Sequence, residues 1–286
     1  MTVTGSPEID RTAAGGSSAA ARQPLLSIIT VVRNDAARLA ATARSVREQS
    51  PAAFEWVVVD GASTDATQGV IDENAGWIAA SVSEPDRGIF DAMNKGVGLA
   101  TGSFVHFLNA GDAFAGPSCA AAICEALEST AADVLAFAAL DVFADGLVAA
   151  RHPAPVQEIL WHRLPTGHQA LVTRRSLMLH HAFDLRYRVC ADYAALASQY
   201  VAGAIVQPVD RPIVRYDRSA SAFSVVNWRL MAAEHWQVQR DLLGEKIHRR
   251  ALSMAKRLLS LAMVRALAIP ILSRPARALA RRAYGA

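Results

Sequence analysis

Four short apolar runs, spaced by about thirty residues, constrain the fold of this chain more than any other feature. They are rich in Val, Ile, Leu and Phe, and they cover residues 25–32, 54–59, 77–82 and 104–108. Between them, residues 36–49, a stretch opened by Ser63-Thr64-Asp65 and residues 89–100 have helical spacing. Strands that alternate with helices in this way form βαβ units, whose strands are parallel and covered on both faces. The sequence therefore predicts an α/β fold.

The second half of the chain is less regular. It predicts a helix over 117–129, a strand pair over 133–151 that turns at Asp145-Gly146, a strand over 168–174 and a helix over 191–202. We expect these elements to extend the same sheet with mixed strands, flanked by helices, and to form the second wall of a cleft. With 52% hydrophobic residues among 286, the chain has enough apolar material for such a core.

The two ends of the chain differ from its body. Residues 1–23 are rich in Gly, Ser, Thr and Ala without an apolar run, so we expect a disordered leader rather than a signal peptide. Residues 245–286 hold ten Lys or Arg and one acid, a net of +9, whereas residues 1–244 hold 19 basic and 25 acidic groups, a net of −6. An acidic body argues against a nucleic-acid-binding domain.

The basic tail contains an apolar run, 258–272, which Arg265 and Pro270 interrupt. A spanning helix needs about 20 apolar residues, so this run is too short and too charged to cross a membrane. We expect residues 245–286 to form a basic amphipathic helix that docks on an anionic membrane surface. That would place the protein in the cytoplasm, peripheral on the inner face of the cell membrane. The alternative is a terminal helix that packs on the acidic body.

Polar residues follow three of the apolar runs, at the position where ligands bind in open parallel sheets. Asp60 ends the second run, the stretch SEPDRG at 83–88 ends the third, and the stretch NAGD at 109–112 ends the fourth. All three should meet at one edge of the sheet. Neither a Walker loop nor a G-x-G-x-x-G is present, so the glycine cradle of a P-loop or nicotinamide dinucleotide site is missing.

The motifs and their order resemble those of family 2 glycosyltransferases with the GT-A fold, a Rossmann-like mixed sheet flanked by helices. The resemblance lies within residues 24–216, in PLLSIITVVRND, FEWVVVDGASTD, SEPDRGIFDAMNKGVGLATGSFVHFLNAGDAF, GHQALVTRRSL and FDLRYRVCADY. These are most similar to the bacterial surface-polysaccharide branch related to colanic acid synthesis. The resemblance implies inverting sugar transfer from a nucleotide sugar, usually with a divalent metal. It also implies a nucleotide-sugar-binding half at 24–115 and an acceptor-binding half at 116–244.

The resemblance assigns a nucleotide-sugar site to residues on and after the first strands. Asp60 would accept hydrogen bonds from the base or ribose, although a turn aspartate before Gly61 is the alternative. The other residues expected to contact the donor here are Thr30, Val32, Asn34, Asp86, Arg87, Asp91, Asn94 and Lys95. Simpler roles stay open for several of them. Asn34 could cap a helix, and Asp86 and Arg87 could form surface ion pairs. Asp91, Asn94 and Lys95 could lie on a solvated helix face.

The stretch 109–112 takes the place of the Asp-x-Asp motif with which most GT-A enzymes hold a metal between the donor phosphates. Asn109 replaces the first aspartate, so Asn109, Ala110 and Gly111 are expected to contact the donor, and Asp112 is the expected metal ligand. Such an oxygen site suits Mg or Mn better than zinc. The alternative is an Asx-type turn that closes a strand.

Asp192 is the expected catalytic base. A carboxylate at the start of a helix can remove the proton of an acceptor hydroxyl as its oxygen attacks the anomeric carbon. An ordinary helix N-cap would explain the residue as well. His168, Gln169 and Tyr193 are expected on the acceptor side. A structural role beside a strand is the alternative for the histidine, and a place in the core for the tyrosine.

Together these features predict an inverting hexosyltransferase that moves a sugar, expected from a UDP-sugar donor, to a saccharide or lipid-linked saccharide in cell-surface polysaccharide synthesis. Two other classes compete with this interpretation. A sugar-nucleotide nucleotidyltransferase would carry a Gly-rich phosphate loop after the first strand, whereas this chain has VVRNDAARLA. A non-catalytic nucleotide-sugar-binding subunit would leave Asp112 or Asp192 pointing out of the cleft.

Overall fold

The structure, a computed structural model, describes residues 23–50, 54–142, 146, 148–217 and 227–267. The first half contains β1 (Leu26–Val32), α1 (Ala36–Arg47), β2 (Phe54–Asp60), α2 (Thr67–Glu73), β3 (Ile78–Ser83), α3 (Ile89–Leu99) and β4 (Phe104–Phe107). β1 pairs in parallel with β2 and with β4, and β2 pairs in parallel with β3. The predicted βαβ organisation of this half is confirmed.

The second half adds shorter and more varied elements. They are β5 (Ala113–Phe114), α4 (Cys119–Glu128), β6 (Val134–Val142), β7 (Val148–Arg151), α5 (Val156–Ile159), the 3-10 helix η1 (His168–Ala170), β8 (Leu171–Arg174), α6 (Arg175–His180), α7 (Ala191–Val201), β9 (Val206–Asp217), α9 (Trp228–Asp241) and α10 (Ile247–Leu267). β8 runs antiparallel to both β4 and β6, while β6 and β9 are parallel. The second half therefore extends the first sheet with mixed strands, as predicted.

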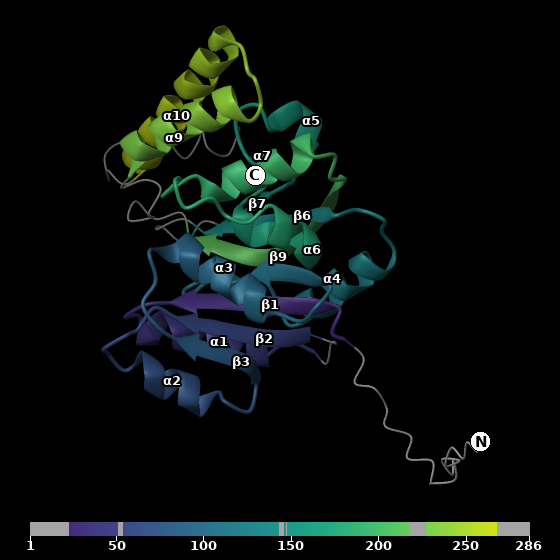
Figure 1. The fold of residues 1–286 in the computed structure, drawn as a ribbon, viewed down its shortest axis with the longest axis vertical. Coiled ribbons are helices and arrows are strands. Elements are labelled where there is room, and N and C mark those ends of the chain that lie inside the picture. Colours follow the sequence, from purple (N-terminus) through teal and green to yellow (C-terminus); the bar gives the residue numbers. More distant parts are fainter. Residues whose placement is uncertain (1–22, 51–53, 143–145, 147, 218–226, 268–286) are drawn as a thin grey trace, which may run out of the picture.

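One mixed sheet lies between two layers of helices in the part of the chain that the structure describes. Its strand order is β3-β2-β1-β4-β8-β6-β9-β5, and β7 pairs with β6. Apolar side chains of α1, α2 and α4 pack on one face, and those of α3, α6 and α7 pack on the other. This double cover explains why all seven residues of β1 are buried. Helices α9 and α10 stack beyond α7, at the end of the molecule opposite β2 and β3 (Figure 1).

Strand β9 has no counterpart in the sequence prediction. It contains Pro208 and Pro212 among charged residues, a composition that lacks the apolar periodicity of the earlier strands. The register of β9 against β6 shifts on both sides of the pair formed by Ala138 and Pro212. Because proline has no N–H to donate to a ladder, it is tolerated at such an irregularity. Pairing with β6, which lies far away in sequence, therefore makes this segment a strand.

The predicted ends of the chain are only partly described. Of the expected leader, 1–23, the structure describes Gln23 alone, and residues 268–286 of the expected tail lie outside the described residues. The first part of that tail does form a helix, α10. Among the helices of the described ranges, none combines the length and the apolar character that a membrane span requires.

Gly96 allows α3 to approach β1 closely, and this contact can be tested. A Cβ at residue 96 would lie 2.4 Å from Cγ2 of the buried Ile29, whereas a Cβ at Gly98 would meet nothing within 4 Å. Gly96→Ala should lower the free energy of unfolding by about 1–2 kcal/mol, because overpacking outweighs the gain in helix propensity. Gly98→Ala is the matched control and should raise it by about 0.5–1 kcal/mol. Equal shifts of the two urea-unfolding midpoints would contradict the close packing.

Candidate active site

Hydrogen bonds join the carboxyl ends of the parallel strands into one edge. The Gly61 N–H donates to the Val32 carbonyl (2.9 Å), and the Ala110 N–H donates to the Val31 carbonyl (3.2 Å). On the other side of β2, the Glu84 N–H donates to the Asp60 carbonyl (3.0 Å). The three acid-bearing segments therefore do lie at one edge of the sheet. Since β2 and β4 flank β1, Asp60 lies about 10 Å across the sheet from the end of β4.

The carboxylate of Asp60 holds the turn that follows β2. It is 1% exposed. Its oxygens accept hydrogen bonds from the backbone N–H and hydroxyl of Ser63 and from the hydroxyl of Ser83 (2.5 Å). This arrangement agrees with the turn role given above as the alternative for Asp60. Direct contact between this carboxylate and a nucleotide stays a prediction.

Asn34 connects the loops after β1 and β2. Its backbone has a φ of 49°, in the left-handed region that asparagine tolerates better than most residues. Its Oδ1 accepts a hydrogen bond from the Thr64 N–H (2.7 Å), and its own N–H donates to Ser63 Oγ (2.7 Å). The cap of α1 is Asp35, whose carboxylate accepts from the Arg38 N–H. Asn34 is therefore not the helix cap. Its side chain is exposed at the edge of the sheet.

Thr30 and Val32 lie inside β1. The Thr30 side chain is completely buried; its hydroxyl donates to the Leu108 carbonyl (2.8 Å) and accepts from Trp56 Nε1 (3.0 Å). Val32 is buried too, and its carbonyl is the partner of Gly61. The expectation that the Thr30 side chain contacts the base disagrees with this placement, because the hydroxyl is used by the core.

The loop after β3 lies against the turn after β2. A Cβ at Gly61 would meet Oδ2 of Asp86 at 2.2 Å, so the Asp86 carboxylate occupies the space that this glycine leaves. Arg87 instead pairs with Asp91 at 2.8 Å and is largely exposed. Its guanidinium holds the pKa of Asp91 below its usual value. Asp86 is therefore part of the edge. Arg87 forms an ion pair, the simpler role given for it, but its partner is Asp91, which is buried and does not lie on the solvated helix face given as its own simpler role.

Asn94 and Lys95 hold neighbouring segments to α3. Asn94 donates to the Phe183 carbonyl (2.9 Å) and accepts from the Phe183 N–H (3.0 Å). The Lys95 ammonium contacts Glu84 (2.8 Å) and the Pro85 carbonyl (2.8 Å). Both side chains thus have protein partners and position loops, and their contact with the donor stays a prediction.

The stretch 109–112 forms a tight turn against α1. The Asp112 N–H donates to the Asn109 carbonyl (2.8 Å), and the Asn109 N–H donates to Asp112 Oδ2 (3.2 Å). Gly111 has a φ of 99°, which favours glycine, and its N–H donates to Thr42 Oγ1 (3.0 Å). The Arg38 side chain lies next to Gly111, where a Cβ would come within 2.9 Å of its Cδ. The turn is thus a β-turn closed by the Asn109 carbonyl and the Asp112 N–H, and the Asx-type turn given as the alternative is not formed, because the Gly111 N–H donates to Thr42.

His168 pairs with Asp192 and feels the charge of Asp112. Nδ1 of His168 lies 3.4 Å from Oδ2 of Asp192, which is in the first turn of α7. Burial by itself would lower the pKa of His168, but the hydrogen bond to Asp192 and the charges of Asp192 and Asp112 outweigh it, so the pKa is raised. This histidine is therefore bonded to the start of α7 and lies close enough to Asp112 for the two charges to interact.

Asp112 is the most perturbed acid of this cluster. Burial raises its pKa to about 6, although the charge of His168, the Asn109 N–H and a hydrogen bond from the Gln169 side chain all act in the opposite direction. Gln169 is held in turn through its carbonyl, which accepts from Nε2 of the buried His106 on β4 (2.7 Å). The placement of Gln169 beside the acids agrees with its assignment to the site.

Tyr193 does not reach the acceptor side. It is buried, its hydroxyl donates to the Leu160 carbonyl, and its ring stacks on His235 with centroids 4.0 Å apart. Although it follows Asp192 directly in sequence, adjacent residues of a helix point about 100° apart, so its side chain turns into the core. The assignment of Tyr193 to the acceptor site is wrong, and the core alternative is correct.

Two residues with no sequence motif belong to the surroundings of the site. Arg151, at the end of β7, pairs with the buried Asp141 (2.6 Å). Its guanidinium nitrogens would lie 3.3 Å from a Cβ at Gly167, the residue before His168. Glu234, buried on α9, accepts hydrogen bonds from the N–H groups of residues 188–190 (2.8, 2.8 and 2.9 Å). Glu234 thereby fixes the backbone that leads into Asp192.

The residues of the cluster fit a metal ion only in part. The described ranges contain no group of three or more His, Cys, Asp and Glu side chains placed to hold a metal. Asp112 offers one carboxylate, and the buried Oδ1 of Asn109 in the same turn has no hydrogen-bond partner. Both are the hard oxygen ligands that Mg and Mn prefer. The site fits a cation that takes most of its ligands from a bound diphosphate and water.

Comparison with known sequences gives a family. The model described as Glycosyl transferase family 2 matches residues 27–185. An uncharacterised glycosyltransferase of Mycobacterium tuberculosis is 33% identical over 175 residues, 59% of this chain and 66% of that protein. The chain thus matches just under two thirds of this relative. A PGL/p-HBAD biosynthesis glycosyltransferase of Mycobacterium bovis is 33% identical over 180 residues, 59% of this chain and 67% of the relative.

Solved structures show the same fold at low identity. S. aureus TarS 1-349 in complex with UDP-GlcNAc has a TM-score of 0.59 and 16% identity, with 88% of this chain and 87% of that chain covered. The mannosyltransferase PcManGT from Pyrobaculum calidifontis, in complex with GDP-Man and Mn2+, has a TM-score of 0.62 and 18% identity, with coverage of 92% and 82%.

The mixed sheet with helices on both of its faces has the GT-A fold of these structures. More than half of the 286 residues fall within the family match at 27–185, and the chain belongs to glycosyl transferase family 2.

The support that Glu234 gives to the start of α7 can be measured. Glu234→Gln replaces one acceptor oxygen by an amide that cannot accept, so at least one buried N–H of residues 188–190 loses its partner. The free energy of unfolding should fall by about 1–3 kcal/mol. Glu73→Gln, at an exposed position on α2, is the control and should change it by less than about 0.5 kcal/mol. Urea denaturation of the two variants compares them; equal stabilities would contradict this role.

Proposed function

We propose that this glycosyltransferase is an inverting enzyme that moves a sugar from a nucleotide sugar, expected to be a UDP-sugar, to a saccharide or lipid-linked saccharide. The observation that carries the proposal is the contact of His168 with Asp192, in a place where the charge of Asp112 also acts on this histidine. An acid of the proposed nucleotide half and an acid of the proposed acceptor half thus lie in one neighbourhood. This arrangement favours an enzyme over a non-catalytic binding subunit, because binding a nucleotide sugar alone does not require the two acids to lie near each other.

Asp192 would act as the base of the transfer. As the acceptor oxygen attacks the anomeric carbon, its proton passes to the Asp192 carboxylate and a new carbon–oxygen bond forms. The bond to the phosphate oxygen breaks on the opposite face, and its electron pair leaves with the nucleoside diphosphate. A single displacement of this kind inverts the anomeric carbon. His168, 3.4 Å from Asp192, would orient the carboxylate toward the acceptor.

The donor would lie along the edge formed by the parallel strands. Residues 109–112 would hold the diphosphate, with the nucleoside toward Asn34, Asp60 and Asp86. A divalent cation, Mg or Mn, would neutralise the departing diphosphate when bound, and Asp112 with Oδ1 of Asn109 would hold it. The UDP-GlcNAc bound by TarS and the GDP-Man and Mn2+ bound by PcManGT support this assignment.

We assign the enzyme to cell-surface polysaccharide synthesis. Two observations support the assignment: its motifs resemble those of the colanic acid branch, and one relative is named for PGL/p-HBAD biosynthesis. An acceptor carried by a lipid would agree with a cytoplasmic enzyme that is peripheral on the inner face of the cell membrane.

Asp192→Asn tests the base. The variant should lose about 10²- to 10⁴-fold in the rate of donor turnover, because asparagine cannot take up a proton, while donor affinity stays nearly unchanged. Turnover is measured as nucleoside diphosphate released from a panel that includes UDP-GlcNAc and GDP-Man, and affinity by calorimetry. Asp72→Asn, at an exposed site on α2, is the control. Wild-type turnover in Asp192→Asn would remove this residue as the base, and a panel without any binding donor would contradict the function.

The metal assignment predicts a different behaviour for Asp112→Asn. In the wild type and in Asp192→Asn, Mn2+ should tighten donor binding relative to EDTA, because a cation held by the Asp112 carboxylate would offset the charge of the donor diphosphate. In Asp112→Asn the affinities with Mn2+ and with EDTA should come close together. Calorimetric titration of the three proteins under both conditions gives the comparison. An equal Mn2+ effect in all three would show that Asp112 does not hold the cation.

A further inference from the structure

Helix α10 exposes large apolar side chains within residues 247–259, whose side chains the structure describes. Ile247 is 67% exposed, Leu252 51%, Leu258 45% and Leu259 71%, while Met254 is half-buried. At about 100° per residue these four lie on one side of the helix, with the exposed Ala251 and Ala255 between them. A helix that packs on its own domain normally turns such a face inward.

Polar groups of α10 face the body in the part whose side chains the structure describes. Ser253 is buried there, and the guanidinium of Arg257 donates to the His162 carbonyl (2.6 Å) and to Nε2 of His235. Burial lowers the pKa of Arg257 and lowers that of His235 well below its usual value, so this histidine is a neutral acceptor. A buried cation therefore helps to hold the helix to the body, while Ile247, Leu252, Leu258 and Leu259 stay exposed.

Cation–ring contacts complete the attachment. Arg249 and Lys256 lie over the Trp161 ring, at 4.9 and 4.8 Å from its centroid, and Arg250 lies over Trp236 at 4.5 Å. These contacts fix the rotation of α10 about its own axis. Specific contacts on the opposite side of α10 therefore direct this apolar face away from the body.

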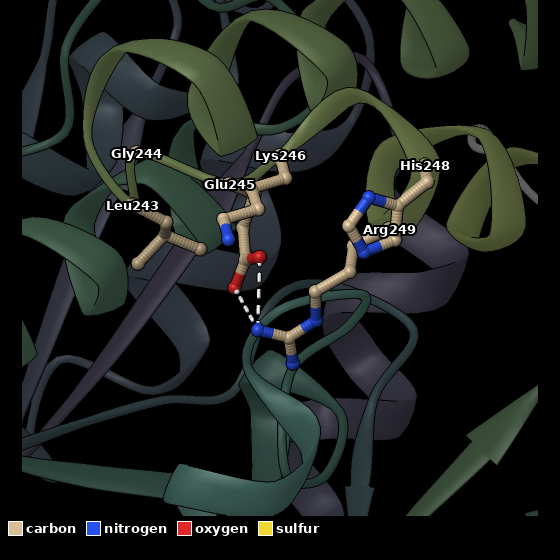
Figure 2. A pocket seen from close by; sticks show the side chains of 6 residues that line it. All are labelled: Leu243, Gly244, Glu245, Lys246, His248 and Arg249. Carbon is tan, nitrogen blue, oxygen red and sulfur yellow. Dashed lines mark hydrogen bonds and ion pairs between the residues drawn. The ribbon is translucent and has the colours of Figure 1, made fainter.

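Cationic groups surround the beginning of this face. A hollow of about 390 Å³ lies where α9 passes into α10, lined by residues 243–246, His248 and Arg249 (Figure 2). Arg249 is paired with Glu245 at 2.9 Å across it. Lys246 and His248, which flank Ile247, are both exposed. In sequence, residues 268–286 add four arginines and no acid.

We propose that the outward face of α10, formed by Ile247, Leu252, Leu258 and Leu259, inserts into the surface of a membrane that contains anionic lipids. Apolar side chains would enter the headgroup boundary while the neighbouring cations contact lipid phosphates. A second copy of this chain is the less suitable partner, because pairing the two faces would bring together two segments that each carry +9. The net of −6 on residues 1–244 would turn the body away from the lipid.

Flotation of the full-length protein with vesicles tests this proposal. The wild type should float with vesicles of mixed phosphatidylcholine and phosphatidylglycerol, and much less with phosphatidylcholine alone. Leu252→Glu combined with Leu259→Glu should reduce the bound fraction at least about tenfold, because carboxylates in the insertion face oppose both burial and charge attraction. The matched control is Leu179→Glu combined with Ile205→Glu, which adds the same charge at sites that are 50% and 58% exposed on other elements.

Each outcome decides the proposal. Loss of binding in the α10 variant with binding retained in the control supports it. Equal binding of the α10 variant and the wild type, or no binding of the wild type to anionic vesicles, overturns it. A dimer in sedimentation equilibrium that Leu252→Glu and Leu259→Glu dissociate, without vesicle binding, would assign the face to a second copy instead. No nucleotide sugar is present in the assay, so its result is separate from that of donor turnover.

Discussion

Two carboxylates from distant parts of the chain can share a partly buried cluster only if their charges are offset. His168 contributes to this through its contact with Asp192, and its raised pKa reflects the hydrogen bond to Asp192 and the charges of both acids. Without the histidine, burial and mutual repulsion would favour separation or protonation of the acids. The placement of these groups therefore depends on η1, a three-residue element that precedes β8 in the chain and is bonded to β4 through Gln169 and His106.

Hydrogen bonds to the backbone hold the segments that carry Asp112 and Asp192 in place. Strand-end hydrogen bonds lock the turns after β1, β2 and β4 together, and Thr42 of α1 holds the turn at 109–112. On the other side of the cluster, consecutive residues of α9 support Asp192 from both directions. Glu234 binds the N–H groups before it, and His235 stacks on Tyr193 after it. Such preorganisation keeps a base oriented without a cost at the moment of reaction.

The sequence predicts the parallel half well and the cluster in part, for physical reasons. Strands covered on both faces must be apolar runs, so β1, β2 and β4 can be recognised directly. β9 cannot, because it carries prolines and becomes a strand only by pairing with β6. Motif position identifies Asp112, His168 and Asp192 but says nothing about where a neighbouring side chain points, which is why Thr30 and Tyr193 were assigned to the site. Glu234 carries no motif, since its partners are backbone groups more than forty residues away.

The link between α10 and α7 has a consequence for how the enzyme would meet an acceptor. Arg257 of α10 binds His235, and His235 stacks on the residue that follows Asp192. The orientation of the apolar face is thereby connected to the start of α7, where Asp192 lies, through two buried contacts, and α9 and α10 lie together at one end of the molecule (Figure 1). A flexible tether would allow the body to tumble above a membrane. A helix fixed by Arg257 and by the ring of Trp161 would instead hold the Asp192 side of the cleft at a constant height above the lipid, where the hydroxyl of a lipid-linked saccharide can approach the carboxylate repeatedly in one geometry.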